Sequence, residues 1–568
     1  MKKRLAADSG SHSGNLARVS QCASETAAAE PKAKRAFYPF LFAMFPVLFL
    51  FTHNIEEVTL AVLPVPLAAS LILTTLFWLP LRLLLRDRQK AGLLAFIFTF
   101  MFFSYGHVLT GLFPKIVRKA VYAPMWTLWA WGLLFLVLVL LVIRCRCGLN
   151  TLTGLLNVFV TVLLVFSLWQ IASFYLLPNH PFTPRVRDEA EDRNLMQQRV
   201  IPRDKLPDIY YLIFDRYASK KNLMQFYDYD NTPFYSLLQE KEFFVAERSN
   251  SNHIRTYLSL CSSLNMDYMP DLLGKLPVQK RVIYRMLQNN RILRLLKALG
   301  YTYIHLGSWY EPTKVNHFAD INYPGAKLSD LAQDFTLKFL NITALAPLGL
   351  SKYSHRKSVL NKFRELFQVS ERPGPKFVFL HMLVPHSPFV FGPNGETLRT
   401  GDLVKRTVEQ KYVDQIRYLN RRIEELVNAI MAHAKISPII IIQSDEGPSK
   451  SESPVNHLAK FKKKRRPFIK NLMGFGILNA YFFPGKDRSI FYDSISPVNT
   501  FRLLFNSYFG THYTILPDIS FNAKETRDKV LEFKVVPNSF FAANMRVRSG
   551  KAVNRRRAAG LNGRKKQK

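Results

Sequence analysis

The sequence contains little cysteine and is short of acidic residues. Four cysteines in 568 residues exclude a small scaffold held together by disulfides. Asp and Glu number 41 against 78 Lys and Arg, so the formal net charge is +37. A charge of that sign favours nucleic acid, an anionic membrane surface or an anionic substrate as partner. Hydrophobic residues make up 48% of the chain and aromatic residues 13%, which excludes a disordered protein of the charged, aromatic-poor kind.

Acidic and basic residues are scarce over a long stretch near the amino terminus. This stretch predicts five apolar spans, at residues 36–53, 58–81, 91–113, 123–143 and 152–177. Most are long enough to cross a hydrocarbon core of about 30 Å. The first is the shortest and contains Pro39 and Pro46. Recurring spans are not typical of a cleaved signal peptide, and basic residues confined to the junctions disfavour buried core helices.

The distribution of basic residues between the spans predicts the orientation. Thirteen Lys and Arg residues lie in the leading segment and in the loops after the second and fourth spans, against three in the loops on the other side. Because loops rich in Lys and Arg stay in the cytoplasm, we expect the amino terminus there. An odd number of spans then places everything after Pro178 outside the cell or in the periplasm.

Composition divides the chain into five parts. A linker is predicted where Pro, Arg, Asp and Glu are frequent, and a solvated tail where ten Lys and Arg residues occur without an acid. The parts are a basic cytoplasmic segment (1–35), a transmembrane domain (36–178), a linker (179–206), an extracytoplasmic domain (207–543) and a basic tail (544–568).

The extracytoplasmic domain alternates short apolar runs with amphipathic stretches. Residues 209–214, 377–380 and 438–442 are typical of buried strands, and residues 412–434 have helical periodicity and lead into the third run. This alternation predicts an α/β domain.

A polar residue follows each of the three predicted strands. Asp215 ends the first run, His381 the second, and Asp445 lies just beyond the third. Open α/β sheets bind their ligands beyond the carboxyl ends of their strands. We therefore expect these three residues to lie at one site.

Four short motifs resemble those of the alkaline phosphatase and sulfatase superfamily, in the same order and with similar spacing. They cover an opening strand that ends in a metal-binding acid, a nucleophile segment, a histidine segment and a second metal motif, at residues 206–215, 250–260, 381–388 and 443–448. The resemblance implies an αβα sandwich. Together with the five apolar spans, it makes the membrane-bound lipoteichoic acid synthases and phosphoethanolamine transferases the most similar proteins.

The resemblance implies a role for each motif residue. Thr256 stands where the family has its nucleophile, and a divalent cation held by Asp215 and Asp445 would lower the pKa of its hydroxyl and orient it. If Thr256 opens a helix, the helix start also favours a phosphate. The alternatives are that Thr256 is an ordinary helix cap, Asp215 a turn residue and Asp445 a solvated loop acid.

Glu446 departs from the family pattern, because the second metal motif usually has a histidine there. If Glu446 is a ligand, the predicted metal set is Asp215, Thr256, Asp445 and Glu446, all through oxygen. Oxygen ligands favour Mn²⁺ or Mg²⁺ over Zn²⁺. The same departure is compatible with a weakened or lost site, or with His457 as a substitute ligand.

His381 and His386 are the remaining catalytic candidates. They would donate hydrogen bonds to phosphate oxygens or to the leaving group. The alternative for His381 is a buried structural histidine. Formylglycine sulfatases are disfavoured, because Cys261 is followed by Ser-Ser-Leu-Asn and not by their signature.

Two functions fit these features best. The first is a membrane-anchored, metal-dependent phosphotransferase or hydrolase that moves a phospho-substituent from a phospholipid head group, through Thr256, to a cell-envelope glycan or to water. The second is a catalytically inactive receptor or assembly protein with the same fold. A transporter is disfavoured, because no charged residue is identified at mid-membrane in the spans. Nucleic acid binding is disfavoured because the basic residues are dispersed along the chain without a basic-aromatic module. The resemblance implies a bacterial inner-membrane protein.

Overall fold

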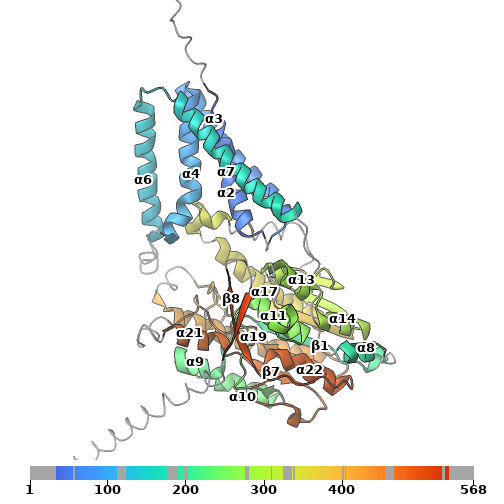
Figure 1. Cartoon of the computed structure of the whole chain (residues 1–568). Coiled ribbons are helices and arrows are strands. Elements are labelled where there is room, and N and C mark those ends of the chain that lie inside the picture. The colour runs from blue at the N-terminus through green and yellow to red at the C-terminus, as the bar shows by residue number, and fades with distance from the viewer. Residues whose placement is uncertain are drawn as a thin grey trace, which may run out of the picture.

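The computed structural model places a bundle of apolar helices on one side and an α/β domain on the other (Figure 1). The structure describes residues 34–55, 58–111, 123–176, 189–197, 202–274, 280–308, 310–323, 335–336, 339–348, 350–398, 402, 405–449, 451–454, 466–526 and 531–536. The predicted basic tail, His457 and most of the leading segment lie outside these residues.

Five apolar helices occupy the five predicted spans. They are α2 (Tyr38–His53), α3 (Pro64–Leu85), α4 (Arg88–Gly111), α6 (Ala123–Arg144) and α7 (Asn150–Leu176), with a short 3-10 helix η1 (Leu60–Val62) before α3. Four are long and apolar enough to cross a membrane. The predicted spans are confirmed as helices, but α2 has 16 residues and is shorter than a spanning helix needs.

Large apolar side chains cover the outside of this bundle. Trp126, Trp129, Leu141 and Trp169 are exposed on α6 and α7. In water such a surface would be unfavourable, at about 25 cal/mol per Å². α2 packs against α7, α3 and α4, whereas α6 contacts α4 at one side of the bundle (Figure 1). The bundle is therefore built to face lipid.

A short segment of the α/β domain packs directly against the bundle. The backbone N–H of Ala344 donates to the carbonyl of Phe102 on α4 at 2.9 Å. The ring of Phe339 lies 5.1 Å from that of Phe103, and both are buried. A side chain at Gly106 would meet the carbonyl oxygen of Asn341 at 2.4 Å, so glycine permits this close approach.

A seven-stranded sheet forms the centre of the α/β domain. Its order is β2-β7-β6-β1-β5-β3-β4. β6, β1, β5, β3 and β4 run parallel, and β7 is antiparallel to both β6 and β2. The bounds are β1 (Ile209–Phe214), β2 (Phe244–Val245), β3 (Thr302–Leu306), β4 (Ile321–Tyr323), β5 (Lys376–Met382), β6 (Ile439–Gln443) and β7 (Asn479–Phe482).

The three predicted strands are the three central strands β1, β5 and β6. Every residue of each is buried, as in sheets covered on both faces. β5 extends to Met382, so His381 lies within the strand and not beyond its end as predicted.

Helices cover both faces of the sheet, which makes three layers. Tyr210, Leu212 and Phe214 of β1 join a core with one set of helices, namely α9 (Lys220–Tyr227), α10 (Thr232–Glu240), α17 (Leu350–Ser370), α19 (Val408–His433) and α21 (Arg466–Phe475). Tyr211 and Ile213 join a core with another set, namely α11 (Thr256–Asn265), α14 (Arg291–Ala298) and α22 (Pro497–Tyr508). This alternation follows the two-residue period of a strand.

The smaller elements lie around these layers. They are α12 (Met269–Leu273), α13 (Lys280–Gln288), α15 (Glu311–Lys314), the 3-10 helices η2 (Arg203–Lys205), η3 (Ala346–Leu348) and η5 (Arg488–Ile490), and the hairpin β8 (Ser520–Glu525) with β9 (Leu531–Val536).

The predicted linker contains a helix. It includes α8 (Glu189–Gln197), on which Asp192 pairs with the buried Arg291 of α14 at 2.6 Å. The helix predicted at residues 412–434 is α19, which begins four residues earlier at a capping box of Thr407 and Gln410.

Candidate active site

Asp215 follows β1 and is buried, with 2% of its surface exposed. Its backbone N–H donates to the carbonyl of Met382 at 2.9 Å, which fixes it beside the end of β5. Its Oδ1 has no hydrogen-bond partner among the described residues. The next residue, Arg216, has φ 64°, a left-handed conformation that is uncommon for a residue other than glycine. Such strain often accompanies a functional site.

Asp445 and Glu446 follow the neighbouring strand β6. Both are buried, and neither side-chain oxygen of Asp445 has a hydrogen-bond partner within the described residues. Gly447 closes the turn, and its N–H donates to the carbonyl of Gly474 at 2.7 Å. A Cβ at Gly447 would meet the carbonyl oxygen of Met473 at 2.1 Å, so this turn needs glycine.

Thr256 is the first residue of α11, as predicted. The N-cap is Arg255, and no side chain caps the helix, so Thr256 is not the cap. The hydroxyl of Ser259, one turn on, donates to the backbone carbonyl of Asp445 at 2.6 Å. This bond holds the first turn of α11 against the end of β6, and the half-buried Thr256 hydroxyl is close enough to influence the carboxyl group of Asp445.

The two aspartates are electrostatically coupled. Burial raises the pKa of Asp215 to about 7, and Arg216 partly opposes this rise. Burial raises the pKa of Asp445 well above its ordinary value, and the charge of Asp215 raises it further. Thr256 acts in the opposite direction. Two buried carboxyl groups that disfavour ionisation, with unpartnered oxygens, form an arrangement that a bound cation would relieve.

Glu446 is directed to Arg216. Its Oε1 accepts from Nε of Arg216 at 3.1 Å, whereas its Oε2 has no hydrogen-bond partner among the described residues. Burial and the charge of Asp445 raise the pKa of Glu446 to about 8, and Arg216 partly opposes them. No group of three or more His, Cys, Asp or Glu side chains in the described part of the chain is arranged to hold a metal. The predicted set of Asp215, Thr256, Asp445 and Glu446 is thus a neighbourhood of oxygen ligands and not a closed shell.

Arg216 and Glu452 complete this neighbourhood and were missed from the sequence. Nη1 of Arg216 donates to Oε2 of Glu452 at 2.8 Å. Burial alone would raise the pKa of Glu452, but Arg216 above all, together with His386 and the N–H of Ser387, lowers it to about 2. Glu452 lies in a polar loop seven residues after Asp445, so only the position of Arg216 directly after Asp215 is a signal in the sequence.

The two predicted histidines lie in β5 and in the segment that follows it. His386 is close enough to Arg216 and Glu452 for their charges to act on it, and burial lowers its pKa to about 4. His381 is fully buried; its Nδ1 is 2.7 Å from the hydroxyl of Thr313, and its Nε2 has no partner among the described residues. Burial lowers the pKa of His381 to about 3. Both rings are therefore neutral at pH 7.

Comparison with known proteins agrees with this architecture. Residues 208–473 match the family model named Sulfatase. No curated protein matches the chain.

Several solved structures are similar to this chain at low sequence identity. The carboxy-terminal periplasmic domain of EptC from Escherichia coli is 12% identical, with a TM-score of 0.38, and the match covers 59% of this chain and 94% of that one. The integral membrane lipooligosaccharide phosphoethanolamine transferase A of Neisseria meningitidis is 13% identical, with a TM-score of 0.34, and the match covers 83% of this chain and 95% of that one.

The family match includes β1, β6 and the acids that follow them, so residues 208–473 form a sulfatase-like domain. The chain joins this domain to apolar helices, four of which are long and apolar enough to cross a membrane.

Proposed function

We propose that the chain is a membrane-anchored, metal-dependent phosphotransferase or hydrolase that uses Thr256 as its nucleophile. The observation that supports this most is the position of Thr256, at the start of α11 and beside two buried aspartates with unpartnered oxygens. A helix start favours an anionic phosphate, and the aspartates favour a cation. Together these features suit phosphoryl chemistry better than acyl or redox chemistry.

In the proposed reaction, the oxygen of Thr256 attacks the phosphorus of a phospholipid. The bond between phosphorus and the lipid alcohol breaks, and the alcohol takes up the proton that Thr256 loses. In the second step, a hydroxyl of the acceptor attacks the same phosphorus and releases Thr256, which recovers a proton. With a cell-envelope glycan as acceptor the enzyme is a transferase, and with water it is a hydrolase.

The side chains around Thr256 fit a divalent cation by their chemistry. Asp215 and Asp445 would hold it, with Thr256, and the remaining oxygen of Glu446 is within the same neighbourhood. When bound, the cation would stabilise the alkoxide of Thr256 and the charge on phosphorus. The all-oxygen set favours Mn²⁺ or Mg²⁺, as the sequence predicts. A related structure of the Escherichia coli EptC domain is a complex with zinc.

Arg216 and the histidines would act on the substrate's charge without a proton transfer of their own. Glu446 and Glu452 hold the Arg216 guanidinium, which keeps a fixed positive charge beside Asp215. His386, neutral at pH 7, would donate a hydrogen bond to a phosphate oxygen or to the leaving group. His381 stands behind it and would orient the site through Thr313.

The apolar helices supply the reason for a lipid donor. They would hold the α/β domain at the bilayer, where phospholipid head groups lie. The chain's +37 charge would also attract an anionic membrane surface. We propose, on the distribution of Lys and Arg between the spans, that the α/β domain lies outside the cytoplasm.

The second candidate function is a receptor or assembly protein that keeps the fold without catalysis. Two observations favour it. Glu446, where the family usually has histidine, pairs with Arg216, and the acids of the described site do not close around one point.

Metal analysis of the purified full-length protein separates the two functions. The enzyme predicts about one Mn²⁺ or Mg²⁺ per chain after dialysis against a mixture of Mn²⁺, Mg²⁺ and Zn²⁺, lost in Asp215→Asn and in Asp445→Asn but retained in Asp204→Asn, an exposed control. Stoichiometric zinc would overturn the preference for Mn²⁺ or Mg²⁺. No bound metal in the wild type would favour the receptor or assembly protein.

A further inference from the structure

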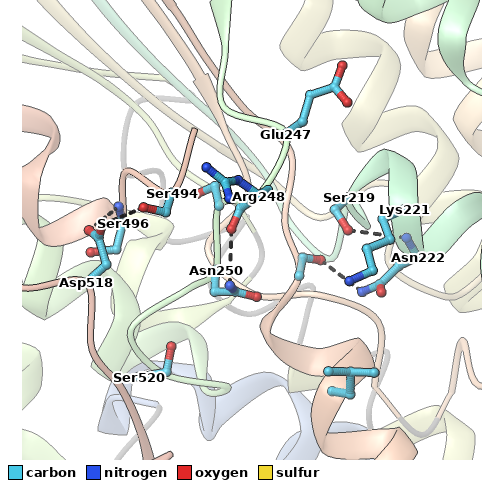
Figure 2. Close-up of a pocket in the computed structure, with 13 residues that line it drawn as sticks. Ser219, Lys221, Asn222, Glu247, Arg248, Asn250, Ser494, Ser496, Asp518 and Ser520 are labelled. Carbon is cyan, nitrogen blue, oxygen red and sulfur yellow. Dashed lines mark hydrogen bonds between the residues drawn. The ribbon is translucent and has the colours of Figure 1, made fainter. Parts of the chain in front are cut away.

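A cavity of about 460 Å³ lies near the candidate active site, and Figure 2 shows the residues that line it. Its volume falls within the range of small-molecule sites. Its walls come from the start of α9, the segment after β2, the chain between α21 and β7, and the segments before α22 and β8. The lining residues are Ser219, Lys221, Asn222, Glu247, Arg248, Ser249, Asn250, Leu472, Gly476, Ser494, Ser496, Asp518 and Ser520.

The sheet places this cavity on the same edge as the aspartates. β2 is antiparallel to β7, and β7 is antiparallel to β6, so β2 runs in the direction of β6 and β1. The segment that follows β2 therefore leaves the sheet at the edge where Asp215 and Asp445 lie. Neighbouring strands are about 4.8 Å apart, so β2 and β6, with β7 between them, are about 10 Å apart.

One backbone segment separates the cavity from the aspartates. The carbonyl of Gly474 accepts from Gly447, in the turn that follows Asp445, at 2.7 Å. Two residues on, the carbonyl of Gly476 accepts from the N–H of Ser219, at the wall of the cavity, at 3.1 Å. The segment after β2 pairs with Gly476 at Asn250 and leads within six residues to Thr256. The cavity is thus an immediate neighbour of the nucleophile.

The lining favours a ligand with many hydroxyl groups. Five serines and two asparagines supply hydrogen-bond donors and acceptors, and Figure 2 shows most of them around the hollow. The hydroxyl of Ser496 is buried and has no hydrogen-bond partner among the described residues. Neutral polar groups of this kind bind sugars and polyols more tightly than they bind apolar ligands.

Most of the charges in the lining are already paired. Glu247 pairs with Lys220 at 3.0 Å, and Arg248 with Asp493 at 3.4 Å. Asp518 accepts from the backbone N–H of Ser496 at 2.9 Å. Lys221, in contrast, makes no ion pair or hydrogen bond within the described residues, and it is exposed to solvent. Lys221 is therefore the cation that is left to recognise an anionic group.

We infer that this cavity binds the acceptor of the proposed transfer reaction, a hydroxyl-rich unit that carries an anionic group. The serines and asparagines contact its hydroxyls, and Lys221 contacts the anion. The inference rests on the proposed function, because only a transferase needs an acceptor site other than water.

Binding of glucose 6-phosphate to the full-length protein in detergent tests this inference. The titration is followed by ligand-observed NMR, with EDTA present so that no metal at the aspartates attracts the phosphate. We expect saturable binding that weakens at least fivefold in Lys221→Glu and in Asn250→Trp. Lys435→Glu, an exposed control that precedes β6 and so lies at the opposite sheet edge, leaves the affinity unchanged. Glucose and inorganic phosphate, each tested alone, bind at least fivefold more weakly.

Three results would overturn the inference: no binding of glucose 6-phosphate, equal binding in all variants, or inorganic phosphate binding as tightly as the sugar phosphate. A different result would contradict the proposed function. In that case no adduct forms on Thr256 of the wild type, whatever the titration shows. If the adduct forms, Asn250→Trp accumulates it at the wild-type rate but transfers it to an acceptor at least tenfold more slowly.

Discussion

At the scale of single residues, the site concentrates negative charge that burial makes unfavourable. Asp215, Asp445 and Glu446 are nearly inaccessible to solvent, yet the described structure supplies one cationic side chain to them, Arg216. Groups arranged in this way reduce the stability of the metal-free protein. Stability lost in this manner is common where a site is kept for function.

Replacing Asp445 tests this residue-scale conflict. We expect Asp445→Asn to raise the free energy of unfolding of the metal-free protein by about 1–2 kcal/mol, because the amide keeps the shape and removes an acid whose ionised form is unfavourable in the folded state. The same change should lower transfer activity at least a hundredfold. Thermal denaturation and turnover of donor lipid measure the two effects, with Asp204→Asn as the exposed control. If the metal-free variant is less stable than the metal-free wild type, the claim that these buried acids reduce stability is wrong.

The raised pKa values of Asp215 and Glu446, about 7 and about 8, predict a pH dependence. Each folded-state pKa lies above its unfolded value, so the contribution to stability is complete at low pH and is lost as the pH rises through 7 and 8. Between pH 7 and 9 the metal-free protein should lose about 2 kcal/mol. The buried histidines have lowered pKa values and act mainly below pH 6.5, outside this window.

Denaturant unfolding at pH 7, 8 and 9, with EDTA and with Mn²⁺, measures this effect. We expect the loss with EDTA to be smaller in Asp215→Asn. We also expect Mn²⁺ to remove most of it in the wild type, because the metal binds the deprotonated carboxylates. If the free energy of unfolding with EDTA does not change from pH 7 to 9, the pKa values of these acids are not raised.

At the scale of secondary-structure elements, the turn after β6 positions the second aspartate. Gly447 leaves no room for a side chain against the backbone of Met473. We expect Gly447→Ala to move this turn, to lower Mn²⁺ affinity at least tenfold, and to cost about 1–3 kcal/mol of stability. Gly148→Ala is the control, because Gly148, like Gly447, has no positive φ, and a Cβ there would meet nothing within 4 Å. Unchanged Mn²⁺ affinity in Gly447→Ala would show that this turn does not position Asp445 for metal binding.

The central elements could be predicted from the sequence because their signals are local. Apolar runs before Asp215 and Asp445 identify the buried strands β1 and β6, and the parallel pairing of β1 with β6 brings their ends together. The position of Thr256 at a helix start was predicted from its motif and is confirmed.

Other features depend on contacts between distant residues. The pairing of Arg216 with Glu446 and with Glu452 joins segments more than 200 positions apart, and no short pattern announces it. For the same reason, the sequence motif assigned Glu446 to the metal and gave no sign of its bond to Arg216. His381 was expected beyond a strand but lies inside β5, because the strand continues for two residues after its last consecutive apolar position, Leu380. The cavity beside β2 is built from several distant segments, and the sequence gives no sign that they meet.

At the scale of the whole molecule, the α/β domain is joined to the helix bundle by packing as well as by the chain. Phe339 and Ala344 contact α4, and Gly106 lets the backbones approach closely. Such a contact would fix the domain's orientation toward the bilayer, and with it the access of a lipid head group to the site.

Gly106→Val should disturb this contact. The added carbons collide with the backbone of Asn341 and Ile342, so we expect the two parts to separate or shift. Activity on phospholipid in vesicles should fall at least tenfold, whereas metal binding, which depends on the α/β domain alone, stays unchanged. Gly132→Val, on α6 with open space around it, is the matched control. Equal losses of activity in the two variants would show that the substitutions act on the helices themselves and not on the contact between α4 and the α/β domain.

The central claim is that Thr256 carries the transferred group, and its direct test is the mass of the protein. The full-length protein is incubated with Mn²⁺ and mixed phospholipids, beside Thr256→Ala, and both are analysed by intact mass and peptide mapping. We predict an added mass on the peptide that contains Thr256, absent from the variant, and its value identifies the phospho-substituent. A wild-type protein that binds the metal, consumes the phospholipid and never carries an adduct on Thr256 under rapid quenching would contradict the claim.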